Sequence, residues 1–386
     1  MNILLITHLY PSYIGQPRSE ISYALHNFTA GWVKNNNIIV VHTLYPSYKN
    51  FLKEGALYQK LDSSFELDSV KIYNKKLFRF PKIYRYFGAD SIKKLLIKIN
   101  FTPDYIISHM YNSYSIGRKL SVFFKCNFII GVHNTDLMYI HKKRFYKCLR
   151  QCSKIVCRSY SINEKLKEIH PVYESKMLIA NSGICEDDIE THEYFLEKAK
   201  SWKNKGKIIF ITVAAFHKLK NIDITLDALS KIHNKTWEYI IIGDGKEKEN
   251  LMEITKAKNL TDRVFFLGEK KREEVLSFLK LSDIFILVSA PETFGLVYLE
   301  AMSKGNIVVG CKGWGIDGIV KDKINGFLCE ARNTDQLVCI LNELCTMPAE
   351  EKSKIINETE KTILNNTNEI AANKYLEMIS KENKIA

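Results

Sequence analysis

Two glutamates, Glu292 and Glu300, are separated by seven residues in a segment whose pattern predicts a strand, a loop and the start of a helix. With the helix starting near Gly295, Glu300 lies about 7 to 8 Å along the helix axis from the first unpaired amides. Such amides can hold a diphosphate, aided by the helix dipole; here they belong to Phe294, Gly295 and Leu296. This spacing suits a nucleoside diphosphate-sugar, with its ribose at Glu300 and its sugar at Glu292. The plain alternative makes Glu292 a helix-stabilising acid and Glu300 a solvated helix residue.

Strands that alternate with helical patterns must position these residues. The chain opens with a strand, a loop that contains Gly15, a helical stretch and a second strand, a unit whose parallel pairing requires a right-handed crossover. In the first half, strands are predicted at Ile3–Thr7, Ile38–Thr43, Tyr105–Ser108, Phe128–Val132, Ile155–Arg158 and Met177–Ala180. In the second half they are predicted at Lys207–Val213, Glu238–Ile242, Val264–Leu267, Ile284–Val288 and Ile307–Gly310. Both halves therefore read as doubly wound α/β domains.

The length of 386 residues exceeds the usual size of one hydrophobic core, so two domains are expected. We place the first domain at 1–183 and the second at 207–367. Residues 184–206 carry charges without a clear strand, which predicts the connection between the domains. Residues 368–386 show helical periodicity with no strand to join, and we expect them to pack back on the first domain.

The segment around the two glutamates resembles the signature of retaining glycosyltransferase family 4. In that signature two glutamates separated by seven residues are followed by Ala-Met and a turn of small residues into a strand. The matching positions are Glu292, Phe294, Gly295, Leu296, Glu300, Ala301 and Met302. The resemblance covers about residues 1–380 and is weak from 45 to 100. It implies the GT-B fold, an α/β fold in which two Rossmann-like, doubly wound parallel-sheet domains face each other across a cleft.

The same resemblance implies a cationic site for the donor phosphates after the strand that ends in ITVAAF. Lys220 falls at the position of the family's phosphate-binding lysine. Ala215 falls where the family has an arginine, so one of two expected cations is missing. Lys218 or His217, from the same loop, could supply that charge. Taken alone, Lys220 would more often be a plain surface lysine.

Three further residues acquire roles through the resemblance. Gly245 follows the strand EYIII, where the family approaches the nucleotide base, and Gly15 lies where the backbone approaches the donor phosphates and the acceptor. His133 opens an HNTD element similar to the family's His-x-x-Asp, whose histidine borders the transferred sugar. A histidine at the end of a strand points to the crevice in which α/β sheets bind ligands. The alternatives are ordinary turns at both glycines and a structural histidine.

The implied reaction is retaining transfer of a hexose-type sugar from a nucleoside diphosphate-sugar to a glycan or lipid-linked glycan in cell-surface polysaccharide synthesis. Its catalytic residues would be Glu292, His133 and Lys220. The donor contacts would come from Glu300, Phe294, Gly295, Leu296, Lys218, Gly245 and Gly15. No cofactor and no protein-bound metal are expected, since no Asp-x-Asp follows an apolar strand. Lys220 and the helix amides would stabilise the departing nucleoside diphosphate in place of magnesium.

Two other functions remain open at this point. A catalytically weak sugar-nucleotide-binding protein of the same fold is favoured by the missing cation at Ala215. A sugar-nucleotide epimerase shares the fold and the donor but should carry several acid/base residues around its hexose. A dinucleotide oxidoreductase is set aside, because no Gly-x-Gly-x-x-Gly opens the first helix.

Composition indicates a soluble globular protein, with 46% apolar and 26% charged residues. The N-terminus MNILLITHLYP predicts a first strand and no signal peptide, and no run is long enough for a membrane span. Nine cysteines without a CxxC pair argue against zinc and against a disulfide framework. We therefore expect a cytoplasmic protein.

The net charge of +13 raises the question of an anionic partner. Residues 71–100 hold nine Lys or Arg against one acid, Asp90, with six aromatic residues interleaved. This composition suits anionic lipid head groups and predicts peripheral binding on the inner face of the cell membrane. A nucleic acid would meet similar chemistry, but no recognised binding motif accompanies the segment. The plain alternative is a solvated basic face beside core aromatics.

Overall fold

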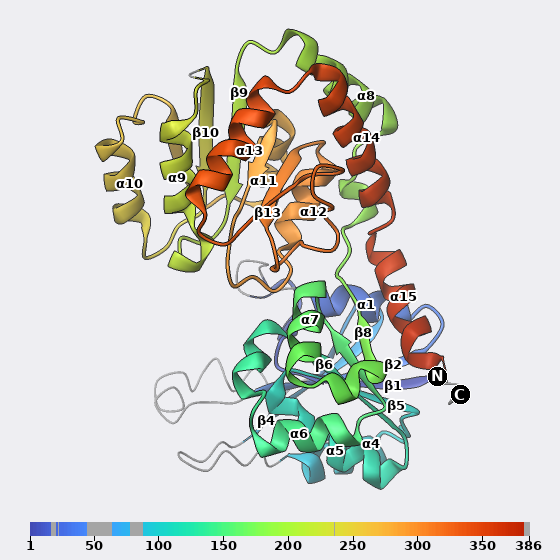
Figure 1. Cartoon of the computed structure of the whole chain (residues 1–386). Coiled ribbons are helices and arrows are strands. Elements are labelled where there is room, and N and C mark those ends of the chain that lie inside the picture. Colours follow the sequence, from blue (N-terminus) through green and yellow to red (C-terminus); the bar gives the residue numbers. More distant parts are fainter. Residues whose placement is uncertain (17–20, 22, 45–63, 78–87, 235, 382–386) are drawn as a thin grey trace. The chain divides into compact units, whose positions relative to one another are not determined.

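The computed structural model describes residues 1–386 except 17–20, 22, 45–63, 78–87, 235 and 382–386 (Figure 1). The chain forms two compact units. The first contains residues 1–158, 162–183 and 368–386, and the second contains 159–161 and 184–367. Each unit is built around one sheet whose strands are almost all parallel.

The sheet of the first unit has the strand order β3-β4-β2-β1-β5-β6-β7-β8. β3 is antiparallel to β4, and every other neighbouring pair in this sheet is parallel. The strands are β1 (Asn2–Thr7), β2 (Asn37–Leu44), β3 (Ser64–Leu67), β4 (Val70–Lys76), β5 (Tyr105–His109), β6 (Asn127–Val132), β7 (Lys154–Cys157) and β8 (Met177–Ile179). The central strands are almost continuously apolar because helices cover both faces of a parallel sheet.

Alternate residues of each central strand enter different cores. Leu4 and Ile6 of β1 pack on one face of the sheet, whereas Ile3 and Leu5 pack on the other. The helices of this unit are α1 (Ala24–Trp32), α4 (Ala89–Lys98), α5 (Tyr111–Phe124), α6 (Lys143–Gln151), α7 (Tyr160–Ile169) and α15 (Asn368–Ser380). The C-terminal helix α15 lies beside α1, where the indole N–H of Trp32 donates to the carbonyl of Ala372 at 2.9 Å (Figure 1).

The sheet of the second unit has the order β11-β10-β9-β12-β13-β14, with all pairs parallel. The strands are β9 (Ile208–Val213), β10 (Trp237–Ile242), β11 (Val264–Gly268), β12 (Ile284–Ile286), β13 (Ile307–Cys311) and β14 (Phe327–Cys329). The helices are α8 (His192–Ser201), α9 (Ile222–Lys231), α10 (Lys248–Ala257), α11 (Arg272–Leu281), α12 (Leu296–Ser303), α13 (Thr334–Thr346) and α14 (Ala349–Leu364). Each strand predicted from the sequence is present, with its ends shifted by at most two residues.

The segment 184–206, expected to connect the domains, is part of the second unit and contains the helix α8. α8 buries Phe195 and Ala199 in the core of that unit. Glu360 of the neighbouring helix α14 lies 2.9 Å from the ring of His192 on α8. Charged residues on the exposed turns of α8 hide the four-residue spacing of its two core side chains.

The basic segment 71–100 is divided between a strand and a helix in the described residues. Its first part is strand β4, which buries Ile72 and Asn74 in the sheet. Its last part is the amphipathic helix α4, whose Ile92 and Leu96 face the core. Residues 78–87, which hold five of the six aromatics, lie outside the described residues.

Candidate functional site

The second unit has its topological switch point at β9, which pairs with β10 on one side and β12 on the other. Open α/β sheets bind ligands beyond the carboxyl ends of the strands at such a point. The loops that leave β9 and β12 are joined there by the amide of Ala290, which donates to the carbonyl of Leu219 at 2.9 Å. The side chain of Asn221 adds a bond to the carbonyl of Val288 at 2.7 Å. These bonds fix the loop that carries Lys220 against the loop that carries Glu292.

Lys220 and Glu292 form an ion pair at this switch point. The ammonium of Lys220 lies 2.6 Å from Oε2 of Glu292, and the hydroxyl of Ser289 donates to the same oxygen at 3.0 Å. The other oxygen, Oε1, accepts from the amide of Thr293 at 3.0 Å. The side chains of Lys220 and Glu292 are 25% and 14% exposed, so an approaching ligand can still reach both groups. The structure thus brings together two residues that lie 72 positions apart in the sequence.

Helix α12 begins beside this pair. Gly295 caps it with φ +79°, and a Cβ at this position would lie 2.7 Å from the ring of Tyr298. Glycine is therefore required both by the backbone conformation and by the space. Within the part of the chain that the structure describes, the amides of Leu296 and Val297 have no acceptor, as expected for a first helical turn. Phe294 buries its side chain in the core and can offer only its backbone to a ligand.

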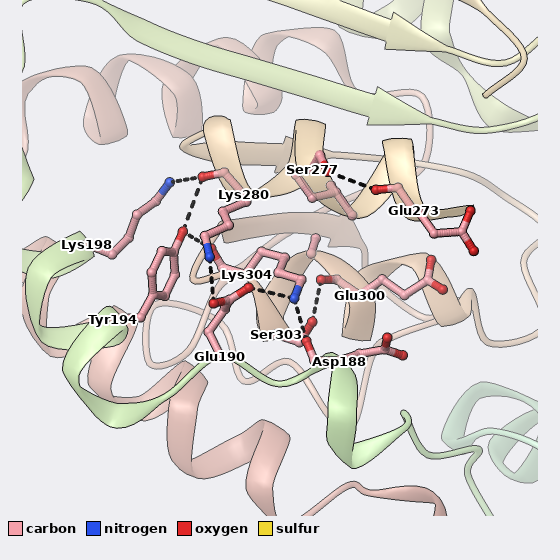
Figure 2. Close-up of polar contacts among 12 residues, drawn as sticks. Asp188, Glu190, Tyr194, Lys198, Glu273, Ser277, Lys280, Glu300, Ser303 and Lys304 are labelled. Atoms are coloured by element: carbon pink, nitrogen blue, oxygen red, sulfur yellow. Dashed lines mark hydrogen bonds and ion pairs between the residues drawn. The ribbon is translucent and has the colours of Figure 1, made fainter. Parts of the chain in front are cut away.

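Glu300 is held by a residue that the sequence analysis did not single out. Nη2 of Arg272 lies 3.1 Å from Oε1 of Glu300, and the same guanidinium binds both oxygens of Asp188, at 3.0 and 2.6 Å. The hydrogen bonds with Asp188, opposed by burial, raise the pKa of Arg272. Figure 2 shows the carboxylates of Glu300 and Asp188 extending to the same side. In the sequence, Arg272 is an isolated arginine at the start of a helix that follows a strand. No spacing pattern connects such an arginine with Glu300.

The segment that contains Asp188 is itself fixed to the helices around it. Lys304 donates to the carbonyl of Asp188 and to the carboxylate of Glu190, both at 2.7 Å (Figure 2). Lys280, near the C-terminal end of α11, pairs with Glu190 at 2.8 Å. Burial of Glu190 opposes its ionisation, but the bonds from Lys280 and Lys304 outweigh it and lower the pKa of Glu190. The partners that orient Glu300 are thereby anchored to both α11 and α12.

Lys218 and Gly245 are the remaining predicted residues of the second unit. Within the described ranges neither makes a hydrogen bond to Lys220 or Glu292, and Lys218 shares a short helix with Lys220. Lys218 lines a cavity of about 210 Å³ that none of the residues 292–300 lines; its walls are His217, Lys218, Ile222, Asp223, Glu247, Asn250, Leu251 and Arg332. Ala215 is exposed, so no side chain at this position fills the place of the family's arginine. Gly245 has φ +152°, and a Cβ there would lie 2.6 Å from the carbonyl oxygen of Phe216. Gly245 thus lets two loops at the carboxyl ends of β9 and β10 approach closely.

His133 and Gly15 belong to the first unit. Gly15 lies in the exposed loop after β1 with φ +79° and open space around it. His133 follows β6, where its amide donates to Oδ2 of Asp136 at 2.8 Å. Asp136 also accepts from the amide of Tyr111 at 2.8 Å and from the hydroxyl of Tyr114 at 3.0 Å. Burial raises the pKa of Asp136 to about 6 against these bonds, so the HNTD element is a tightly bonded turn.

The described residues contain neither a cluster of metal ligands nor a helix able to cross a membrane. No group of three or more His, Cys, Asp and Glu side chains there is arranged to hold a metal ion. Of the helices in the described ranges, none combines the length and the apolar character that crossing a bilayer demands.

Comparison with known proteins finds relatives of the second unit. Residues 194–362 match the family Glycosyl transferases group 1. One relative is N-acetyl-alpha-D-glucosaminyl L-malate synthase of Bacillus anthracis, 34% identical over 36% of this chain and 38% of that protein. Another is the O-antigen biosynthesis glycosyltransferase WclY of Escherichia coli, 39% identical over 48% of this chain and 54% of that protein. These matches thus span from about a third to about half of the length of those relatives.

Among solved structures, Anabaena Alr3699/HepE in complex with UDP superposes with a TM-score of 0.73 at 16% identity, covering 98% of this chain and 100% of that one. The same protein has been solved with UDP-glucose, with a TM-score of 0.69. This likeness confirms the predicted fold class, GT-B. The match to the family Glycosyl transferases group 1 includes the segment around Glu292 and Glu300.

Proposed function

We propose that this protein transfers a hexose-type sugar from a nucleoside diphosphate-sugar to a glycan or lipid-linked glycan acceptor. The observation that carries the proposal is the cluster at the switch point of the second sheet. It combines a cation, Lys220, a half-buried carboxylate, Glu292, and the open amides of α12, with Glu300 further along the same helix. Support also comes from the neighbours solved with UDP and UDP-glucose and from a relative in O-antigen biosynthesis.

Each group has a role that its chemistry allows. Lys220 and the amides of Leu296 and Val297 bind the diphosphate and stabilise the charge that develops as it leaves. Glu300, oriented by Arg272, accepts hydrogen bonds from the ribose hydroxyls. Glu292 contacts the transferred sugar, and we assign His133 to the same sugar because HNTD resembles the family's His-x-x-Asp element.

Transfer is tested with the full chain, a panel of UDP-, GDP- and ADP-sugars, and lipid-linked glycan acceptors. We expect one nucleotide sugar to be consumed, with release of nucleoside diphosphate and a product heavier by one sugar in mass spectrometry. Return of an isomerised sugar nucleotide in the absence of acceptor would instead show an epimerase. Absence of both reactions for every donor would contradict the proposal.

Retention of anomeric configuration and independence from metal are part of the proposal. In this mechanism the leaving phosphate itself takes the acceptor's proton, so no dedicated base is needed. Proton NMR of the product reports the anomeric configuration directly. Assays in EDTA, compared with added magnesium, report the metal requirement, and a loss of activity in EDTA that magnesium restores would overturn that part.

A second candidate is a sugar-nucleotide-binding protein with little catalytic power. It is favoured by Ala215, which is exposed and leaves Lys220 without the second cation expected from the family. Lys218 lines a cavity that neither Lys220 nor Glu292 lines. Ala215→Arg separates the two candidates, because an added cation should raise the turnover of a weak enzyme. Tight donor binding without turnover, in both the wild type and this variant, would favour the binding protein.

Glu300→Gln should weaken binding of the free nucleoside diphosphate without disturbing the fold. A charged acceptor for two ribose hydroxyls becomes a weaker one, at a cost of about 1 to 3 kcal/mol in binding free energy. Calorimetry measures the affinity, and circular dichroism confirms folding. Glu343→Gln is a matched control, since Glu343 lies in the same unit and pairs with Lys323 at 2.9 Å. Unchanged affinity in Glu300→Gln would remove this residue from the site.

We further propose that the acceptor is met at an anionic membrane surface. Lys75, Lys94 and Lys98 line a hollow on the first unit together with Asp90. Ile97 on α4 is 57% exposed close to these lysines. Lysines beside exposed apolar side chains suit a lipid interface, and each basic residue near an anionic surface adds about 1 kcal/mol of binding free energy. Arg79 and Lys82 of the same segment lie outside the described residues.

Co-sedimentation with vesicles tests this surface. We expect binding to anionic vesicles and not to neutral ones, and a large loss when Lys75, Lys94 and Lys98 are changed together to Glu. The control changes three exposed lysines elsewhere to Glu, at positions Lys200, Lys256 and Lys354. Equal losses in both triple variants, or binding indifferent to lipid charge, would leave a soluble acceptor as the better hypothesis.

A further inference from the structure

A chain of hydrogen bonds runs through the interior of the first unit and ends on His133. The hydroxyl of Tyr375 lies 2.9 Å from Nε2 of His109, and Nδ1 of His109 lies 2.9 Å from Nε2 of His133. Tyr375 belongs to the C-terminal helix α15, His109 ends β5, and His133 follows β6. Two hydrogen bonds therefore connect the last helix of the chain to this histidine.

Packing fixes the geometry of this chain. The side chains of His109 and Tyr375 are both fully buried. A Cβ on Gly131 would lie 2.2 Å from the ring of His109, so glycine at this position of β6 leaves the space that the ring occupies. The ring of Tyr375 meets those of Trp32 and Phe28 edge to face, with centroids 5.0 and 5.2 Å apart. Neither the ring of His109 nor that of Tyr375 has room to rotate without disturbing the core.

The surroundings keep both histidines neutral. Burial, and after it nearby positive groups, hold the pKa of His109 and of His133 well below the usual value. One of these groups is Arg158, which is buried and donates to the carbonyl of Ala180 and the hydroxyl of Ser182, both at 2.6 Å. Burial lowers the pKa of Arg158 only to about 10, so it stays charged at neutral pH. A neutral imidazole has one nitrogen that donates and one that accepts.

Only one direction of hydrogen-bond donation gives the hydroxyl of Tyr375 an acceptor. In the described part of the molecule, this hydroxyl has His109 as its partner. If Nε2–H of His109 donated to it, the buried O–H of Tyr375 would have no acceptor, which is costly. Tyr375 therefore donates to Nε2 of His109, and Nδ1–H of His109 donates to Nε2 of His133. The remaining proton of His133 then lies on Nδ1.

We propose that Tyr375 and His109 are positioning residues that hold His133 in its Nδ1–H form. In this form Nδ1 of His133, which takes no part in the hydrogen bond with His109, carries an N–H donor. Such a donor is suited to a hydroxyl oxygen of a sugar. Its catalytic consequence rests on the proposed function, in which His133 borders the transferred sugar. The C-terminal helix thereby acts on the reaction through a side chain that never touches the substrate.

Nitrogen NMR of the full chain with ¹⁵N-labelled histidine tests the proton positions without any substrate. The signals of His133 are assigned by their loss in His133→Gln. We expect a protonated Nδ1 and an unprotonated Nε2 for His133 in the wild type, and a mixture of tautomers in Tyr375→Phe. A protonated Nε2 on His133 in the wild type, or a pattern unchanged in Tyr375→Phe, would overturn the inference whether or not the protein is a transferase.

Kinetics then test the consequence for the reaction. Tyr375→Phe should lower kcat roughly tenfold, the effect of a transition-state contact worth one hydrogen bond, with the donor KM unchanged. Tyr10→Phe is the matched control, because Tyr10 is also buried in the first unit and its hydroxyl bonds a histidine ring, that of His26, at 2.8 Å. It should lose similar thermal stability and keep its kcat. An equal fall of kcat in both variants would reduce Tyr375 to a structural role, whereas an inactive wild type would contradict the proposed function and leave the NMR result to decide the inference.

Discussion

Lys220→Ala should reduce turnover by about a thousandfold and weaken binding of the free nucleoside diphosphate by about tenfold to a hundredfold. Lys220 is the cation that the structure places on Glu292 at the switch point, 2.6 Å from its carboxylate. Its loss removes a charge-assisted contact to the phosphates in the ground state and a larger one as negative charge develops on the leaving group. Steady-state kinetics and calorimetry on the same preparation measure the two effects separately.

The control for this variant is Lys231→Ala. Lys231 lies on α9 of the same unit and pairs with Asp227 at 2.8 Å, so its removal also breaks an ion pair of a surface lysine. We expect the control to keep both turnover and affinity. If Lys220→Ala behaves like Lys231→Ala, the donor phosphates do not bind at the switch point.

Glu292→Gln should lower kcat by about a hundredfold while the affinity for free nucleoside diphosphate changes by less than about threefold. The proposed contact of Glu292 is with the transferred sugar, which free nucleoside diphosphate lacks. Glutamine keeps the size of the side chain. Its oxygen can still accept from the amide of Thr293, and its NH2 group can donate to the hydroxyl of Ser289, so the loop should keep its shape. Glu292→Ala should show the same separation with a larger fall in kcat.

Two outcomes would contradict this assignment. Equal losses of kcat and of nucleoside diphosphate affinity would place Glu292 at the leaving group. A variant that unfolds at a clearly lower temperature would assign Glu292 to loop stability. Glu343→Gln, which breaks an exposed pair with Lys323, provides the baseline for both measurements.

Most of the fold was predictable because buried parallel strands have a simple sequence pattern. β1 and β13 are continuous apolar runs bounded by polar residues, and periodicity alone locates them. The missed strands lack this pattern. β3 and β4 lie at the sheet edge and alternate with charged residues such as Glu66 and Lys71, which pair across the two strands. β14 is only three residues long, too short for a periodic signal.

The site was predictable to the extent that one continuous segment encodes it. The loop and the first two turns of α12 hold Glu292, Gly295 and Glu300 within nine residues, so their spacing is visible in the sequence. Arg272 reaches Glu300 from 28 positions away, and Asp188 reaches Arg272 from 84 positions away, so no local spacing indicates these contacts. The same holds for Tyr375, which meets His109 across 266 residues. Long-range partners of this kind follow from topology, which the sequence pattern defines only coarsely.

The central claim is that the switch point of the second sheet binds a sugar nucleotide through Lys220 and Glu300. Calorimetric titration of the wild type, Lys220→Ala and Glu300→Gln with UDP-, GDP- and ADP-sugars tests it most directly. We predict that one of these donors binds the wild type at one site per chain and that both variants bind it at least tenfold more weakly, as expected for the loss of a charged contact. A wild type that binds none of these donors would contradict the account. Equally tight binding of the donor to all three proteins would also contradict it.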